Sequence, residues 1–402
     1  MDGDERAIVG ATMLGHAMVH TYELSIPVFV PIWLSEWGLT PAAVGTLVAV
    51  GYALFGVGAL PSGVLADVVG SRRLILVCVG GMGAAFLVVA AAPGPAGLLV
   101  GLGLWGLAAS IYHPAGLSLI SRGVERRGVA LGYHGVAGNV GTALGPLATL
   151  LLLLVVDWRT TAALLALPAA VGVALVFVLD VPDPGVASAP DGGEGLDLRT
   201  YAADAASLFR GGFALVFAIV VLEGLFYRGT LTFLPDLFTG FAAVSPVSVA
   251  GRSIDPARFL YAGLLLVGVA GQFVGGRLTD HVREERLLVG VFALLALVAL
   301  AFVPAASAGF GPLVLASAAL GVVLFGEQPV LQSTVAEHST ADVRGVSYGF
   351  MYVGVFGVGA LGAALAGVVL TYASPREMFL GLAGVATLAG VLALTLAHRS
   401  RA

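Results

Sequence analysis

Apolar stretches of about twenty residues recur from one end of the chain to the other, and this pattern restricts the possible folds more than any other feature. A helix of roughly 20 apolar residues is long enough to cross a hydrocarbon core about 30 Å thick. The chain is 58% hydrophobic and only 11% charged, whereas a soluble domain carries about 25% charged residues. The sequence therefore predicts an all-α membrane protein.

We expect twelve transmembrane helices in two six-helix bundles. The predicted spans are 7–33, 42–62, 73–92, 96–120, 129–155, 160–179, 212–238, 257–277, 286–304, 310–334, 344–370 and 376–397. A polar stretch from Pro182 to Arg210 separates the sixth span from the seventh. We therefore expect an N-terminal bundle at 1–181, a cytoplasmic linker at 182–210 that ends in a short surface helix at 198–209, and a C-terminal bundle at 211–402.

The arginines predict how the chain is oriented. All nineteen basic residues are arginine, and with twelve spans fourteen of them share a side with the termini and the linker. Four fall on the other side, and Arg228 lies inside the seventh span. Because basic residues are enriched in cytoplasmic loops, we expect both termini in the cytoplasm of a cell-membrane protein. The net charge of −5 gives no indication of nucleic-acid binding.

An internal repeat relates the two halves of the chain. The segment Gly63–Asp67 recurs as Gly276–Asp280, and every matched residue is offset by 213. A second pair, Arg127–Val129 and Arg344–Val346, has an offset of 217. The chain is therefore predicted to be a duplicated six-helix unit, which is the architecture of transporters that rock two bundles around a central site.

The first repeat unit resembles the signature loop between helices 2 and 3 of the major facilitator superfamily. The residues of this gating loop are Gly63, Asp67, Gly70, Arg72 and Arg73, with Asp280 in the second half. A glycine-flanked turn with an acid and two arginines can form ion pairs in one conformation and break them in another. The resemblance implies that Asp67 has a gating role near the start of the eleventh predicted span, 344–370. The alternative is a solvated loop whose arginines only set the topology.

The fifth predicted span, 129–155, carries a second motif that resembles the superfamily's antiporter motif. It consists of Gly132, Gly141, Gly145 and Pro146. The glycines make a flat face for a neighbouring helix, and the proline permits a bend. The resemblance favours antiport, whereas a role in helix packing alone would apply equally to a symporter.

Three further stretches resemble the fosmidomycin-resistance branch of the superfamily. The first predicted span carries histidines and the paired prolines Pro27 and Pro31. The fourth span carries His113-Pro114, and the fifth carries Gly138-Asn139-Val-Gly141. This branch often has an aspartate where His20 stands. The resemblance implies a drug–proton antiporter.

Ionisable residues inside membrane spans are costly and usually functional. At 100° per residue, His16, His20 and Glu23 lie at 0°, 40° and −20° on helix 1, so they share one face. Histidine titrates near neutral pH, so this face could bind and release protons. The alternative is that the histidines only bond backbone or neighbouring helices.

The second half carries ionisable residues on two of its predicted helices. Glu223 and Arg228 lie in the seventh span, where Arg228 could face helix 1 across the cavity, bind an anionic substrate, or pair with Glu223. Glu327 and Gln328 lie in the tenth span, where the repeat of His113-Pro114 should fall. With Asn139 and His134 of the first half, these matched polar residues suggest a central site.

The leading hypothesis is a secondary transporter that exports a small organic solute by proton-coupled antiport. A second is a symporter or facilitator that takes up a small, possibly anionic, metabolite. A remote alternative is an intramembrane metal-dependent enzyme with His16 and His20 as ligands, although no zinc-protease signature is present. A receptor or scaffold is equally remote. We expect no enzyme activity, no cofactor and no metal site, and a monomer whose partners are the lipid bilayer, the substrate and protons.

Overall fold

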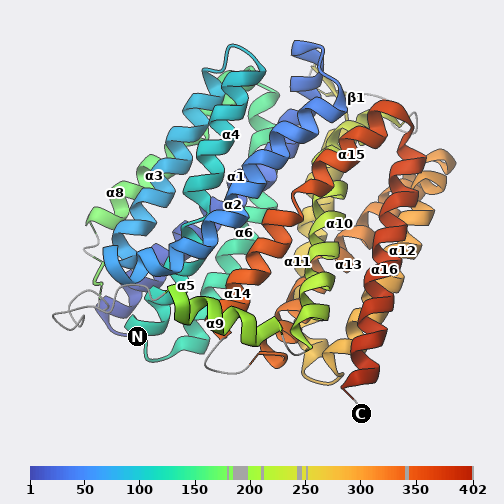
Figure 1. Ribbon diagram of the computed structural model, residues 1–402. Coiled ribbons are helices and arrows are strands. Elements are labelled where there is room, and N and C mark those ends of the chain that lie inside the picture. Colours follow the sequence, from blue (N-terminus) through green and yellow to red (C-terminus); the bar gives the residue numbers. More distant parts are fainter. Residues whose placement is uncertain are drawn as a thin grey trace. The chain divides into compact units, whose positions relative to one another are not determined.

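The computed structural model describes residues 1–178, 181–183, 198–209, 212–241, 247–249, 252–339 and 344–400. Most of the predicted linker therefore lies outside the described residues. Within them, twelve helical segments are long and apolar enough to cross a membrane (Figure 1). The predicted fold class is confirmed: this is an all-α membrane protein with twelve transmembrane segments in two six-helix, pseudo-symmetric bundles.

Six membrane-spanning segments form the first half. Their helices are α1 (Gly3–Trp37), α2 (Pro41–Val69), α3 (Ser71–Ala90), α4 (Pro95–Ala109) with α5 (Tyr112–Gly123), α6 (Arg127–Leu153), and α7 (Trp158–Leu164) with α8 (Ala166–Val178). Helix α3 packs against α4, α7 and α8.

The second half begins with the short helix α9 (Leu198–Phe209), which lies where the sequence predicted it. The helices that follow are α10 (Phe213–Gly240), α11 (Ala257–Thr279), α12 (Glu284–Ala308), α13 (Phe310–Glu337), α14 (Arg344–Tyr352), a π-helix (Val353–Val358), α15 (Leu361–Tyr372) and α16 (Pro375–Arg399). Helix α10 packs against α15 and α16, and α13 packs against α11 and α12. An antiparallel hairpin that the sequence did not predict, β1 (Val247–Val249) and β2 (Arg252–Ile254), joins α10 to α11.

Two compact units divide the chain. The first contains Met1–Phe29 and Val50–Asp197, and the second contains Val30–Ala49 and Leu198–Ala402. The connection between α1 and α2 thus belongs to the second unit, where the backbone N–H of Ala42 donates to the hydroxyl of Thr371 over 2.8 Å.

The surface of the helices is apolar, as expected for contact with lipid. Leu315 is 72% exposed and Phe273 is 66% exposed, while Glu23, Arg228 and Glu327 are at most 1% exposed. In water this distribution would be unfavourable, but in a bilayer it places apolar side chains against lipid and ionisable groups inside the protein.

Two predicted spans are broken by proline. The span predicted at 96–120 is found at Pro95–Gly123, but it is broken in the middle, because α4 ends at Ala109 and α5 begins at Tyr112. Pro114 lacks an N–H, and its ring would clash with the carbonyl group of Ser110 in a continuous helix. Pro168 acts in the same way on the carbonyl of Leu164, where α7 ends.

The span predicted at 344–370 is also not a uniform α-helix, because a π-helix interrupts it between α14 and α15. Its end passes very close to α10: a Cβ added to Gly359 would lie 2.6 Å from the Cα of Gly224. Such π-helical turns are frequent at functional sites.

The predicted loop after span 2 is largely helical, so this part of the prediction is wrong. Helix α2 continues to Val69, and Gly63 and Asp67 lie within it. Nothing in this segment interrupts the helix until Gly70, whose φ of 94° lies in the left-handed region that glycine tolerates. Helix α3 then begins at Ser71, so the turn between the two helices is a single residue.

The glycines of α6 allow close contact with α1. A Cβ added to Gly141 would lie 2.1 Å from the carbonyl oxygen of Ala17, and one added to Gly145 would lie 2.6 Å from the Cα of Thr21. The corresponding helices of the second half meet in the same way, since a Cβ at Gly362 of α15 would lie 2.2 Å from the carbonyl oxygen of Leu225 of α10. Helix packing thus accounts for Gly141 and Gly145, and the antiport role of the motif stays a prediction.

This packing gives a direct test with a matched control. Gly141→Ala must push α1 away from α6, so we expect the free energy of unfolding to fall by about 1–3 kcal/mol. Gly132→Ala changes the same helix where nothing lies within 4 Å of the added carbon, so it should leave stability unchanged or raise it slightly. Melting temperatures of the purified protein in detergent measure both. Equal destabilisation by the two substitutions would contradict the close packing.

Candidate functional site

The ionisable face predicted on α1 is present and forms a hydrogen-bonded chain. Nδ1 of His20 lies 2.8 Å from Oε2 of Glu23, and Nε2 of His20 lies 3.1 Å from Nε2 of His16. Nδ1 of His16 lies 2.7 Å from the backbone carbonyl oxygen of His134 on α6. The side chain of Glu23 is 1% exposed and that of His20 is 21% exposed. These hydrogen bonds therefore connect a partly exposed histidine to a buried carboxyl group.

The carbonyl at one end fixes where the protons lie. A carbonyl oxygen only accepts, so Nδ1 of His16 must carry a proton, and the Nε2 of a neutral His16 must accept. His20 then donates from Nε2. Its Nδ1 either accepts from a protonated Glu23 or, in an imidazolium, donates to the carboxylate. In both forms one ionisable proton is shared by His20 and Glu23, and a single proton separates the two Nε2 atoms.

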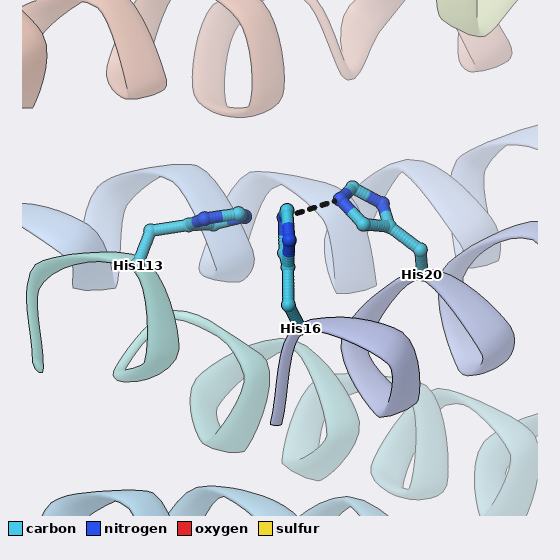
Figure 2. A group of neighbouring side chains, drawn as sticks. All are labelled: His16, His20 and His113. Atoms are coloured by element: carbon cyan, nitrogen blue, oxygen red, sulfur yellow. Dashed lines mark hydrogen bonds between the residues drawn. The ribbon is translucent and has the colours of Figure 1, made fainter. Parts of the chain in front are cut away.

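A third histidine approaches this pair from another helix. His113 stands in the first turn of α5, directly after the break that Pro114 causes, and it is 7% exposed. Its ring centroid lies 5.3 Å from that of His16 and 5.8 Å from that of His20. Figure 2 shows His16 between the other two rings. The nitrogen atoms of these three side chains that could bind a metal lie within 4.8 Å of one another.

Residues of helix α6 pack against the ring of His16. The ring of His134 stacks on that of His16 at a centroid distance of 3.8 Å and an interplanar angle of 13°. A Cβ at Gly138 would lie 2.4 Å from Cε1 of His16, so only glycine leaves room for this ring. Asn139, the next residue, is partly exposed and makes no side-chain hydrogen bond among the described residues. Its predicted site role stays a prediction.

Two tyrosines that we did not predict as site residues help to position α1. The hydroxyl of Tyr112 donates to the carbonyl of Thr12, and the ring stacks on that of His16 at 5.7 Å. The hydroxyl of Tyr52 donates to the backbone carbonyl of Glu23 over 3.0 Å. A signal was present for Tyr112, because it adjoins His113-Pro114, but Tyr52 looks like any apolar-span tyrosine in the sequence.

In the second unit, Arg228 lies among aromatic rings. It is 1% exposed on α10, and its guanidinium carbon lies 5.1 Å from the ring centroid of Tyr227 and 4.9 Å from that of Phe356. Phe356 belongs to the π-helix, so the irregular turn brings this ring to the arginine. The sequence singled out Arg228 but gave no signal for Phe356. A buried guanidinium close to aromatic rings is well suited to an anion that also carries an aromatic ring.

The predicted acidic residues of the second unit lie near one another. Glu223 on α10 is 3% exposed and Glu327 on α13 is 0% exposed, and the two carboxyl groups interact electrostatically. Gln328 instead accepts a hydrogen bond at its side-chain oxygen from the amide of Gln272, over 2.6 Å. The structure thus brings Glu223 and Glu327 together and ties Gln328 to α11.

The gating residues are described only in part. The side chain of Asp67 lies outside the described residues, so its gating role stays a prediction. Arg72 is partly buried, and its backbone N–H donates to Asp183 over 2.8 Å, whereas Arg73 is exposed. Asp280 is exposed and caps the end of α11, while Asp67 lies inside α2, so the repeat is not reproduced turn for turn.

Comparison with known protein families agrees with the twelve-helix architecture. The family model of the Major Facilitator Superfamily matches residues 12–360 and, in a second alignment, residues 238–402.

Characterised relatives include three bacterial proteins. The gallate transporter of Pseudomonas putida is 26% identical over 90% of this chain and 85% of its own length. The gentisate transporter of Corynebacterium glutamicum is 26% identical over 90% of this chain and 81% of its own length. The puromycin resistance protein pur8 of Streptomyces alboniger is 39% identical over 108 residues, a segment that spans 26% of this chain and 22% of that protein.

Solved structures share the fold over almost the whole chain. A bacterial homologue of the human lysosomal transporter Spinster, in an inward-facing and occupied conformation, has a TM-score of 0.74 at 14% identity, with 99% of this chain and 98% of that chain covered. The peptide transporter POT in complex with sulfate has a TM-score of 0.76 at 17% identity, with 98% and 94% covered. With the match along residues 12–402, these findings show that the chain belongs to the Major Facilitator Superfamily.

Proposed function

We propose that this protein is a secondary transporter of small aromatic carboxylic acids. The observation that carries the proposal is Arg228, a buried cation whose guanidinium lies 4.9 Å from the ring centroid of Phe356 and 5.1 Å from that of Tyr227. A guanidinium binds a carboxylate through two parallel hydrogen bonds, and an aromatic side chain binds a substrate ring by stacking. Arg228 and its neighbouring rings thus offer both kinds of contact that an aromatic acid requires.

The relatives support the same substrate class. Gallate and gentisate are both hydroxylated benzoates, and the two transporters named for them match this chain along 90% of its length. The proposal thus adopts the second sequence hypothesis, the transport of a small anionic metabolite, and specifies that the anion is aromatic.

The aromatic-acid proposal is tested first at the arginine. Hydrogen bonds to charged groups contribute about 1.5–3 kcal/mol, so Arg228→Gln should weaken uptake of gallate, gentisate or benzoate into proteoliposomes by about 10- to 100-fold in apparent affinity. Arg228→Lys keeps the charge but loses the planar pair of donors, so it should recover part of the affinity. Arg258→Gln is the control, because Arg258 is an exposed arginine of the same unit. Unchanged affinity in Arg228→Gln would rule out this role.

A second test addresses the aromatic ring. Aromatic pairs contribute about 0.5–1.5 kcal/mol beyond the area they bury, so Phe356→Leu should raise the KM for gentisate by about 2- to 10-fold with little change in kcat. Phe273→Leu removes a phenyl ring that is 66% exposed and should have no effect. If the two variants have the same KM as the parent, the ring of Phe356 does not contact the substrate.

Drug export is a second candidate function. The similarity to the puromycin resistance protein favours it, although that similarity covers 26% of this chain. Proton antiport, the leading sequence hypothesis, and the likeness to the fosmidomycin-resistance branch stay predictions. Vesicles that hold the purified protein can be offered labelled puromycin and labelled gentisate under opposite pH gradients. Export by antiport requires that puromycin is transported and that its flux reverses with the gradient. Aromatic-acid transport requires that gentisate is transported and that puromycin is not transported in its place.

A further inference from the structure

Four of the seven histidines in the sequence gather in the first unit. The proposed binding of an aromatic acid at Arg228 does not use this histidine cluster, which is made of His16, His20, His113 and His134. Imidazole nitrogens are the preferred ligands of borderline divalent ions such as Zn²⁺, Co²⁺ and Ni²⁺, whereas Mg²⁺ and Ca²⁺ prefer oxygen.

The spacing of the ring nitrogens fits such an ion. Metal–nitrogen bonds of about 2.0–2.1 Å in tetrahedral geometry place two ligand nitrogens about 3.3–3.4 Å apart. The Nε2 atoms of His16 and His20 lie 3.1 Å apart, separated by one shared proton. An ion could replace that proton if the two nitrogens separated by a few tenths of an ångström and both rings tilted toward an ion beside the line that joins them. His113, whose ligand atom lies within 4.8 Å of the other two, would supply a third nitrogen after a small rotation of its ring.

The second nitrogen of each α1 ring is held as it is in metal-binding histidines. Such residues almost always donate their other N–H to a carboxylate or to a backbone carbonyl, which fixes the orientation of the ring. Here Nδ1 of His16 donates to the carbonyl of His134, and Nδ1 of His20 meets the carboxyl group of Glu23. Both kinds of orienting group are thus present, and both leave Nε2 directed at the other histidine.

The residues around the cluster hold the ring of His16 in place. His134 is 6% exposed and stacks on His16, while Gly138 leaves the space that the His16 ring occupies. We propose that His16, His20 and His113 bind one divalent transition-metal ion of the Zn²⁺, Co²⁺ and Ni²⁺ group, with Glu23 and the carbonyl of His134 as orienting groups. The sequence prediction assigned no metal site, because no motif supplied a third ligand beside His16 and His20.

Titration of the purified full-length protein tests the site. The protein is prepared with an affinity tag that contains no histidine, stripped with EDTA and titrated with Co²⁺, then with Zn²⁺. We expect one Co²⁺ per chain, a visible d–d absorption band, and its loss when Zn²⁺ displaces Co²⁺. Addition of Mg²⁺ should leave the band unchanged.

Variants assign the ligands. His113→Ala should weaken Co²⁺ binding by more than about 100-fold, because loss of a ligand should cost more than loss of an orienting group. Glu23→Gln keeps all three ligands and should weaken binding by about 10- to 100-fold at unchanged stoichiometry. His281→Ala is the control, since His281 is exposed and lies in the second unit. Melting temperatures without metal show whether each variant is folded, and His20→Ala replaces His113→Ala if the latter is not.

Two outcomes would overturn the proposal. One is a parent protein that binds no Co²⁺ or Zn²⁺ in the micromolar range. The other is a folded His113→Ala or His20→Ala variant that binds Co²⁺ as the parent does. Because no aromatic acid is present in these titrations, their result is independent of the transport assays on Arg228.

Discussion

A hydrocarbon core offers no water to an ionisable side chain, so every such group in a spanning helix must find its hydrogen bonds or charges within the protein. This constraint organises the molecule. Glu23, at 1% exposure, meets His20, and Arg228 lies between two aromatic rings. The acidic Glu223 and Glu327 are near neighbours in the second unit. Because such groups are costly, the places where they gather are the places where the chemistry of transport is to be sought.

Close helix packing makes the histidine cluster possible. The glycines of α6 let its backbone touch α1 at Ala17, and one turn away Gly138 leaves room for the ring of His16. The same approach brings the carbonyl of His134 to 2.7 Å from His16. Packing and chemistry are therefore coupled here: a larger residue at Gly138 or Gly141 would separate the helices and also break the hydrogen-bonded chain that begins at this carbonyl.

The two units carry different chemistry despite their common architecture. The first presents imidazole nitrogens and a carboxyl group, which suit a proton or a divalent cation. The second presents a guanidinium close to two aromatic rings, which suits an aromatic anion, and one of these rings, Phe356, belongs to the π-helix. The two halves thus share the close packing of their glycine-bearing helices but differ in the ionisable residues of their candidate sites.

The sequence by itself determined the number and approximate limits of the spans, the shared face of His16, His20 and Glu23, and the burial of Arg228. These follow from hydropathy and helical periodicity, which are local properties. Only the tertiary structure decided that His113 and His134 join His16, because His16 and His134 are 118 positions apart and meet only through helix packing. The breaks before Pro114 and Pro168 agree with a known steric rule. The π-helix that contains Phe356 and the close approach of Gly224 and Gly359 beside it have no such local signal.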